Sequence, residues 1–271
     1  MKQGLHKAIF ILKKQDMNKG IELATTPWKS VKDEKFELAV LPWGATEPHN
    51  LHLPYGTDSI LSSAIACRSV EKAQAKGVGC IVLPVIPLGS QNPGQTELLF
   101  CLHARYDTQR SILADVVASL HRQGLRKLVI VNGHGGNNFR NMIRDLALDY
   151  PDFYIAVTDW YTVEKTAGYF TTPGDHADEL ETSVMMHFHP EWVLPLEEAG
   201  KGEGKSFSIP ALKNKQAWIP RHWTSVTTDT GIGNPGASTA EKGKRYAEKV
   251  TDTLAEFLVD FARTGVDKFY E

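Results

Sequence analysis

Residues 38–58 read Leu38-Ala39-Val40-Leu41-Pro42-Trp43-Gly44-Ala45-Thr46-Glu47-Pro48-His49-Asn50-Leu51-His52-Leu53-Pro54-Tyr55-Gly56-Thr57-Asp58. The apolar residues at 38–41 predict a buried strand. Behind the polar loop, apolar residues recur at helical spacing from Asp58, a candidate N-cap, to Lys76, and Gly77 is a typical helix stop. A strand, a loop and a helix in this order begin a βαβ unit, so the stretch predicts an α/β fold with a mostly parallel sheet.

The rest of the chain repeats this alternation of short apolar runs and longer segments with helical period. We predict strands at 81–85, 128–131 and 154–157, and helices at 106–122, 138–147, 178–189 and from Ser238 or Thr239 to Phe261. The last helix is expected to cover one face of the sheet. Residues 198–204 are rich in glycine and predict a mobile surface loop, and the stretch that follows, up to Trp223, predicts a flap.

Length and charge limit the class of protein. At 271 residues the chain has the size of a large single α/β domain, and we expect one domain at 25–271 behind an N-terminal extension at 1–24. The chain holds 30 basic and 32 acidic residues, with no long basic run. Nucleic acid and a membrane surface are therefore not expected as partners, and a small molecule is expected instead.

The cysteines and the apolar segments indicate a compartment. Cys67, Cys80 and Cys101 show no CxxC spacing, so neither a disulfide framework nor a thiolate zinc site is predicted. No apolar run approaches the ~20 residues that a membrane span needs, and the apolar patch at 8–12 is too short for a secretory signal. We expect a cytoplasmic protein with reduced cysteines.

The loop at 47–58 concentrates potential metal ligands. Glu47, His49, His52 and Asp58 lie within twelve residues, directly after the first predicted strand. Carboxylates and imidazoles together are ligands of zinc and manganese. An ordinary polar loop without a ligand explains the same residues, and the loop alone does not decide between the two readings.

Two further polar segments lie near strand ends or helix starts, and the carboxyl ends of parallel strands are where such sheets bind ligands. The segment 132–137, Asn-Gly-His-Gly-Gly-Asn, follows the strand at 128–131, and we favour His134 as a ligand over a phosphate loop or a structural turn. In the segment 175–183, a helix that begins near Asp178 brings Glu181 close to His176. An acidic helix start explains Asp178 and Glu179 but not His176.

These motifs together resemble the creatininase family of metal-dependent amidohydrolases, and the resemblance covers roughly residues 25–262. The motifs that carry it occur in the family's order: Glu47-x-His49, Pro54-x-Gly56-Thr57-Asp58, Asn132-Gly133-His134-Gly135-Gly136-Asn137, and His176-Ala177-x-x-x-Glu181-Thr182-Ser183. Trp28, Gly231-Ile232-Gly233-Asn234-Pro235 and Ala240-Glu241-Lys242-Gly243 extend the similarity.

The resemblance implies a three-layer α/β/α sandwich with two divalent metal ions, zinc and/or manganese, in a homo-oligomer such as a hexamer. The expected roles are as follows: metal ligands Glu47, His49, Asp58 and His134, with Asp58 as the bridge, and His176 for proton transfer. Creatininase has a metal-binding Glu at the place of Gly136. We therefore expect Glu181 to complete the second metal's ligands.

The expected reaction is hydrolysis of a C–N bond in a small cyclic amide, creatinine-like, by a metal-activated water. His176 would protonate the leaving nitrogen. Ser90, Trp160 and Asp175 are the expected substrate contacts, although Trp160 fits a core position equally well, and His52 is expected to orient a ligand. The alternatives are a formamide hydrolase, a peptide-processing member of the family, and a metal- or ligand-binding protein without catalysis.

Overall fold

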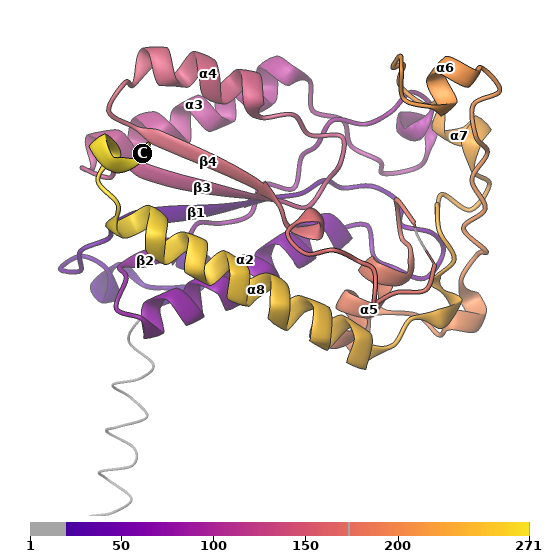
Figure 1. The fold of residues 1–271 in the computed structure, drawn as a ribbon, viewed down its shortest axis with the longest axis horizontal. Coiled ribbons are helices and arrows are strands. Elements are labelled where there is room, and N and C mark those ends of the chain that lie inside the picture. The colour runs from indigo at the N-terminus through magenta and orange to yellow at the C-terminus, as the bar shows by residue number, and fades with distance from the viewer. Residues whose placement is uncertain (1–19, 173, 271) are drawn as a thin grey trace, which may run out of the picture.

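The computed structural model describes residues 20–172 and 174–270, so most of the predicted extension lies outside the described residues (Figure 1). Four parallel strands form the central sheet in the order β2-β1-β3-β4. Their bounds are β1 Leu38–Trp43, β2 Cys80–Val82, β3 Lys127–Asn132 and β4 Tyr154–Asp159. All four predicted strands are present, and the sheet is parallel as predicted.

Helices cover both faces of the sheet, which confirms the three-layer α/β/α sandwich (Figure 1). One face carries α2 Thr57–Ala75, α5 Glu179–Phe188 and α8 Ala240–Arg263, and the other carries α3 Tyr106–Arg122 and α4 Arg140–Asp149. Successive strand side chains point to opposite faces. Val40 therefore packs in the cluster under α2 and α8, whereas Leu41 packs in the cluster under α3 and α4.

The strand order reverses between β1 and β3. The chain runs from β1 outward to β2 and then returns to the other side of β1 to form β3. Loops that leave the carboxyl ends of two such strands diverge to opposite faces and leave a crevice between them. The loop with Glu47 and His49 and the loop with His134 leave β1 and β3, so the topology brings the candidate ligands to one place.

The strand ends differ from the prediction because of two prolines. β1 continues through Pro42, whose carbonyl accepts a hydrogen bond from Ile86 N at 3.1 Å on the side of β2. β2 has already ended at Val82, so the missing N–H of Pro42 costs no bond in the ladder. The strand predicted at 81–85 was too long, since Pro84 has no N–H to donate.

The helix starts explain where two carboxylates point. Asp58 was predicted to cap α2, but Gly56 occupies that position and Asp58 lies in the first turn, so its carboxylate is free to face the site. Asp178 does cap α5, since its side chain accepts a hydrogen bond from Glu181 N at 3.1 Å. Thr239 caps α8 in the same way through Lys242 N.

The segment at 198–226 forms a lobe beside the carboxyl ends of the strands (Figure 1). It contains the short helices α6 Pro210–Lys213 and α7 Trp223–Val226. Gly200 N donates to Asn50 Oδ1, and Trp223 N donates to Pro93 O, so two loops hold the lobe. Among the described residues, no helix combines the length and the apolar character that a membrane crossing requires.

Candidate metal centre

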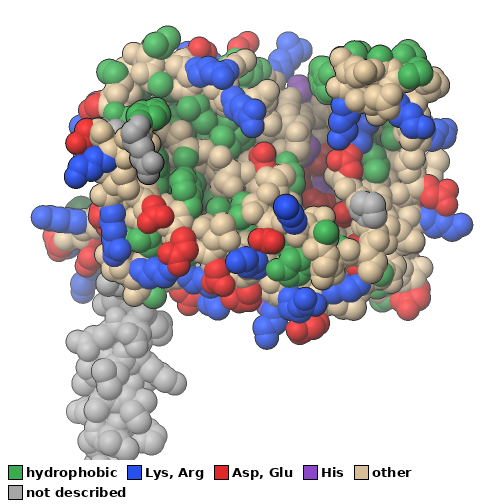
Figure 2. Space-filling model, in the orientation of Figure 1, with side chains coloured by type: hydrophobic (Ala, Val, Ile, Leu, Met, Phe, Trp, Pro, Cys, Tyr) green, Lys and Arg blue, Asp and Glu red, His purple; other side chains and the backbone are tan. Residues whose placement is uncertain are grey.

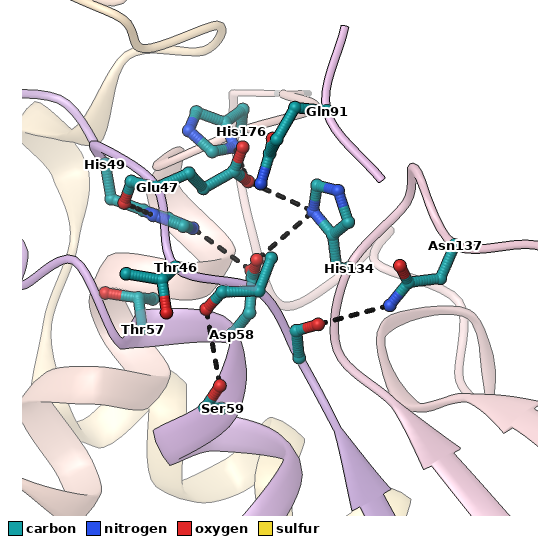
Figure 3. A network of polar contacts seen from close by, with 12 residues as sticks. Thr46, Glu47, His49, Thr57, Asp58, Ser59, Gln91, His134, Asn137 and His176 are labelled. Carbon is teal, nitrogen blue, oxygen red and sulfur yellow. Dashed lines mark hydrogen bonds and ion pairs between the residues drawn. The ribbon is translucent and has the colours of Figure 1, made fainter. Parts of the chain in front are cut away.

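Six candidate residues from four parts of the chain meet at the crevice between β1 and β3. Figure 3 shows the side chains of Glu47, His49, Asp58, His134 and His176 pointing toward one another. They are Glu47 and His49 from the loop after β1, Asp58 from α2, His134 from the loop after β3, and His176 and Glu181 from the start of α5. All are buried except Glu181, which is half-buried. The six residues that the sequence predicted as ligands or proton carrier therefore do lie together.

Glu47, Asp58 and His134 form a first group of potential ligands, with ligand atoms within 4.8 Å of one another. His134 Nδ1 lies 3.0 Å from Glu47 Oε1 and 3.2 Å from Asp58 Oδ2. Both of these oxygens are buried, and neither accepts a well-directed hydrogen bond from the described residues. Buried carboxylate oxygens rarely lack such partners, and a divalent cation would satisfy both.

His49, Asp58 and Glu181 form a second group that meets the same distance limit. His49 Nε2 lies 3.1 Å from Asp58 Oδ1, so the two oxygens of Asp58 face different imidazoles. A third group, Glu47, His49 and His176, overlaps both. Asp58 belongs to the first and second groups, and these buried residues are able to hold a metal centre.

Backbone carbonyls orient the two ligand imidazoles. His134 Nε2 donates to Ser90 O at 2.9 Å, and His49 Nδ1 donates to Glu47 O at 3.0 Å. The other ring nitrogen of each imidazole faces the carboxylates, and it is the nitrogen that binds a metal once its proton is lost. Ser90, expected to contact substrate, thus has its backbone carbonyl engaged by His134.

The loop that carries His134 leaves no room for a side chain at two of its glycines, Gly133 and Gly136. A Cβ at Gly133 would collide with the carbonyl oxygen of Asp58, and a Cβ at Gly136 would collide with Ser90 O and His134 Nε2. In this arrangement residue 136 cannot supply a carboxylate. Glu181 is the carboxylate that stands beside His49 and Asp58 instead.

A residue that the sequence analysis missed directs Glu47. Gln95 Nε2 donates to Glu47 Oε2 at 2.5 Å, while Asn92 N holds Gln95 Oε1 at 2.7 Å. These bonds leave Glu47 Oε1 to face His134 and His176. No sequence spacing links Gln95 to Glu47, because they lie 48 positions apart and meet only when the loops fold together.

Without metal, protons are redistributed inside the cluster. Burial opposes charge on His49, but the negative charge of Asp58 outweighs it and raises the pKa of His49 to about 10. Burial likewise opposes charge on Asp58, but His49 and His134 hold the pKa of that carboxyl below its usual range. Burial raises the pKa of Glu181 to about 8. The metal-free site thus holds protons that a metal ion would displace.

His176 lies at the edge of this cluster, buried beside Glu47 and His49. Its Nδ1 is 3.7 Å from Glu47 Oε1, and its Nε2 donates to Pro48 O at 2.9 Å. Burial, reinforced by His49, lowers the pKa of His176. Backbone hydrogen bonds with Ile232 in both directions hold the residue in place. The imidazole is therefore neutral at neutral pH, with a free nitrogen toward the ligand groups.

Three other predicted residues have partners within the chain. Trp160 is fully buried in the core against Tyr246, so the structure agrees with its core alternative and not with a pocket wall. Asp175 forms an ion pair with Arg221. His52 Nε2 pairs with Thr182 Oγ1 at 2.9 Å, so its ring does not orient a ligand as expected, and burial lowers the pKa of His52 to about 4.

Comparison with protein families shows which family the chain belongs to. Residues 24–258 match the family model Creatininase, described as creatinine amidohydrolase. The chain belongs to the creatininase family. The match includes every residue of the two ligand groups, and it confirms the resemblance drawn from the sequence motifs.

Named relatives in the creatininase family differ in their substrates. A mycofactocin precursor peptide peptidase from Mycobacterium ulcerans is 26% identical, over 94% of this chain and 94% of that protein. A 3-dehydro-scyllo-inosose hydrolase from Thermotoga maritima is 26% identical, over 89% and 83%. A creatinine amidohydrolase from Pseudomonas putida is 26% identical, over 65% and 75%. The chain is thus a hydrolase of a family with varied substrates.

Solved structures share the fold. A Bacteroides fragilis protein with the provisional name creatinine amidohydrolase is 53% identical, with a TM-score of 0.90 over 93% of this chain and 99% of that chain. A creatininase of the Zn-Zn type is 22% identical, with a TM-score of 0.74 over 90% and 99%. A creatininase with Mn is 21% identical, with a TM-score of 0.73 over 90% and 100%. At such identities the last two show the fold alone.

Proposed function

We propose that the chain is a metal-dependent amidohydrolase that cleaves a C–N bond of a small cyclic amide, creatinine-like. One observation carries the proposal: two groups of ligands, buried except for the half-buried Glu181, share Asp58, and a neutral imidazole, His176, stands beside them. A carboxylate shared by two ligand groups is typical of two-metal hydrolytic sites. The named relatives include a creatinine amidohydrolase, which supports this choice of substrate.

The ligand roles follow from the two groups. Glu47, Asp58 and His134 would hold one ion, and His49, Asp58 and Glu181 the other, with Asp58 as the bridge. The donor set of carboxylate oxygens and imidazole nitrogens suits two divalent ions, zinc and/or manganese. Such ions, when bound, supply Lewis acidity toward a carbonyl oxygen and lower the pKa of water.

The residues of the chain then move the proton. His176 is neutral and presents Nδ1 toward Glu47, so it can accept a proton from the attacking water. The same nitrogen returns the proton to the leaving nitrogen as the C–N bond breaks. Without that proton an amide nitrogen is a very poor leaving group. Pro48 O fixes the tautomer that makes this transfer possible.

A second candidate function has its own support. The relative from Mycobacterium ulcerans matches nearly the whole chain and is named a peptide peptidase. The same ligand groups and the same His176 would serve a formamide hydrolase or a peptide-processing enzyme, because all of these reactions break an amide C–N bond. Only the pocket around the site distinguishes these substrates. The remaining alternative, a metal- or ligand-binding protein, has no need of a proton carrier beside its ligands.

A substrate screen tests the proposal. Protein reconstituted with zinc or manganese is incubated with cyclic amides, formamides and short peptides, and released ammonia, amine or carboxylate is measured. We expect turnover of a cyclic amide that is abolished by a chelator and restored by added metal. Turnover of peptides or formamides alone would favour the second candidate, and no metal-dependent turnover of any class would contradict both.

A further inference from the structure

One buried polar group beside the site has no partner. Trp223 is only 2% exposed, yet its indole Nε1 finds no hydrogen-bond acceptor among the described residues. Its ring stands at 87° to the ring of His176, with the ring centres 5.2 Å apart. A buried indole N–H usually donates to an acceptor. An unsatisfied donor next to His176 therefore suggests an acceptor that arrives with a ligand.

A cation lies directly on this indole. The guanidinium carbon of Arg221 is 4.9 Å from the centre of the Trp223 ring, and Arg221 pairs through Nη1 with Asp175. An arginine carries five N–H donors. Within the described part of the chain, Asp175 is the one hydrogen-bond acceptor of Arg221. Its side chain is one-third exposed, so it is not enclosed by the described residues.

Both residues belong to the lobe that borders the site. Figure 2 shows a hollow between the main body and this lobe, with histidine side chains visible inside it and Lys or Arg side chains on the lobe at its rim. Trp223 N donates to Pro93 O, and Gln95 in the same loop holds Glu47. The lobe's donors are therefore placed in a fixed relation to the ligand groups.

We propose that Arg221 and Trp223 bind a carboxylate of the substrate. The class of substrate is then an amide, cyclic or open, whose carboxylate lies a few bonds from the scissile C–N bond. A guanidinium fork and an indole N–H are both donors, and a carboxylate accepts from both. Asp175 pairs with the guanidinium through Nη1, and the other guanidinium N–H groups have no acceptor among the described residues. The inference rests on the proposed function, because it assumes that the bond is cut beside His176.

The test compares matched pairs of probes by equilibrium binding to the metal-loaded full chain. Each pair consists of a carboxylate and its carboxamide: 5-oxoproline and its amide, N-acetylalanine and N-acetylalaninamide, and several dipeptides and their amides. We expect the carboxylate of at least one pair to bind about tenfold or more tightly. In Arg221→Gln this preference is lost, and in Trp223→Phe it falls several-fold at unchanged metal content.

Three variants separate recognition from structure. Arg245→Gln removes a guanidinium stacked on Tyr169, and Trp160→Phe removes another unpartnered buried indole N–H. Both should retain the preference for carboxylates. Asp175→Asn should also retain the preference, because in the proposal Arg221, and not Asp175, binds the carboxylate. If Asp175→Asn lost the preference as Arg221→Gln does, the effect of Arg221 would come from its ion pair with Asp175 and not from a contact with the carboxylate. The proposal would then be wrong.

Two results would overturn the inference directly. Equal binding of carboxylate and carboxamide in every pair is one, and no measurable binding of any probe is the other. Turnover is scored separately on the same probes. Selective binding that depends on Arg221, together with no hydrolysis of any probe, would support the carboxylate site while contradicting the proposed function.

Discussion

At the scale of single residues, Asp58 joins the two ligand groups. Its Oδ1 lies 3.1 Å from His49 and its Oδ2 lies 3.2 Å from His134. The residue stands in the first turn of α2, where a negative charge is also favoured by the helix dipole. Because Gly56 takes the capping position, both oxygens remain available to the site.

Metal binding at these residues should release protons. At pH 7 the metal-free protein holds a proton on His49, whose pKa is about 10, and on Glu181, whose pKa is about 8. Both groups bind metal only when deprotonated, so metal and protons compete and the metal affinity falls as the pH is lowered. Calorimetric titrations with metal in two buffers of different ionisation enthalpy measure the release.

In the same titrations, His49→Gln should release fewer protons, because it removes one of the protonated groups that the metal would deprotonate. Metal binding without any net proton release at pH 7 would show that the imidazole and the carboxyl are already deprotonated in the metal-free protein. The proposed competition would then be wrong.

His176 should affect turnover and not metal content. His176→Gln removes the proposed proton carrier, so we expect turnover of the substrate found in the screen to fall by roughly 10²–10⁴-fold. Elemental analysis of the same sample should give the metal content of the original protein. A loss of metal would instead identify His176 as a ligand, in line with its place beside Glu47 and His49.

The control for this variant is His121→Gln. His121 lies on α3, where it pairs with Asp152 away from the ligand groups. Turnover in His121→Gln should stay at the original level. Equal turnover in His176→Gln and His121→Gln would exclude His176 as the proton carrier.

At the scale of elements, the start of α5 is held by a buried carboxylate. Glu179 is fully buried, and its Oε2 accepts from the backbone N–H groups of Thr171 and Thr172 at 2.8 Å and 2.7 Å. Its Oε1 accepts from Lys242 Nζ at 2.6 Å, which joins α5 to α8. The segment that leads to His176 is thereby fixed to both helices. From the sequence, Glu179 was explained as one of the acidic residues that favour a helix start. The structure shows instead that it binds Lys242, 63 positions away, and Thr171 and Thr172, 7–8 positions away.

Glu179→Gln should destabilise the fold. An amide at this position has one oxygen and one NH2 group. Its NH2 group would face either the backbone N–H groups of Thr171 and Thr172 or the ammonium group of Lys242, all of which are donors. We expect the free energy of unfolding to fall by about 2–3 kcal/mol, measured by urea denaturation. Glu241→Gln, in the exposed first turn of α8, should change it by less than about 0.5 kcal/mol. Equal effects in the two variants would contradict the role of Glu179.

The success of sequence-based prediction also varied by element. Within residues 20–172 and 174–270, hydrophobic periodicity located every strand of the sheet and all five long helices, because strands and helices bury apolar residues at fixed spacing. It placed two strand ends wrongly. β1 continues through Pro42, because no strand beside Pro42 needs its missing N–H group, and β2 ends before Pro84, which has no N–H group to donate. The motifs located the six residues of the cluster. Gln95, Arg221 and Trp223 were missed because only tertiary contacts bring them to the site.

At the scale of the whole molecule, the ligand groups join segments that are distant in the chain. The loop after β1, the start of α2, the loop after β3 and the start of α5 all contribute to one cluster. Several like and unlike charges are buried there without metal, which is unfavourable unless they are paired. Bound ions would hold these segments together and stabilise the folded chain.

Removal of metal should therefore lower the thermal stability. With free metal at 100 times its Kd, binding stabilises a folded chain by about 2.7 kcal/mol, which for this size corresponds to a Tm rise of roughly 5–10 °C. Differential scanning calorimetry before and after a chelator measures the difference, and re-addition of zinc or manganese should reverse it. An unchanged Tm would show that the cluster holds no metal that matters to the fold.

The central claim is that Asp58 bridges two metal sites, and metal content tests it most directly. Asp58→Ala should reduce the metal bound per chain from about two equivalents to almost none, because both groups lose a shared ligand. Asp107→Ala, which removes a carboxylate from the first turn of α3, serves as the control and should leave the metal content unchanged. Two equivalents retained in Asp58→Ala, measured by elemental analysis, would contradict the claim.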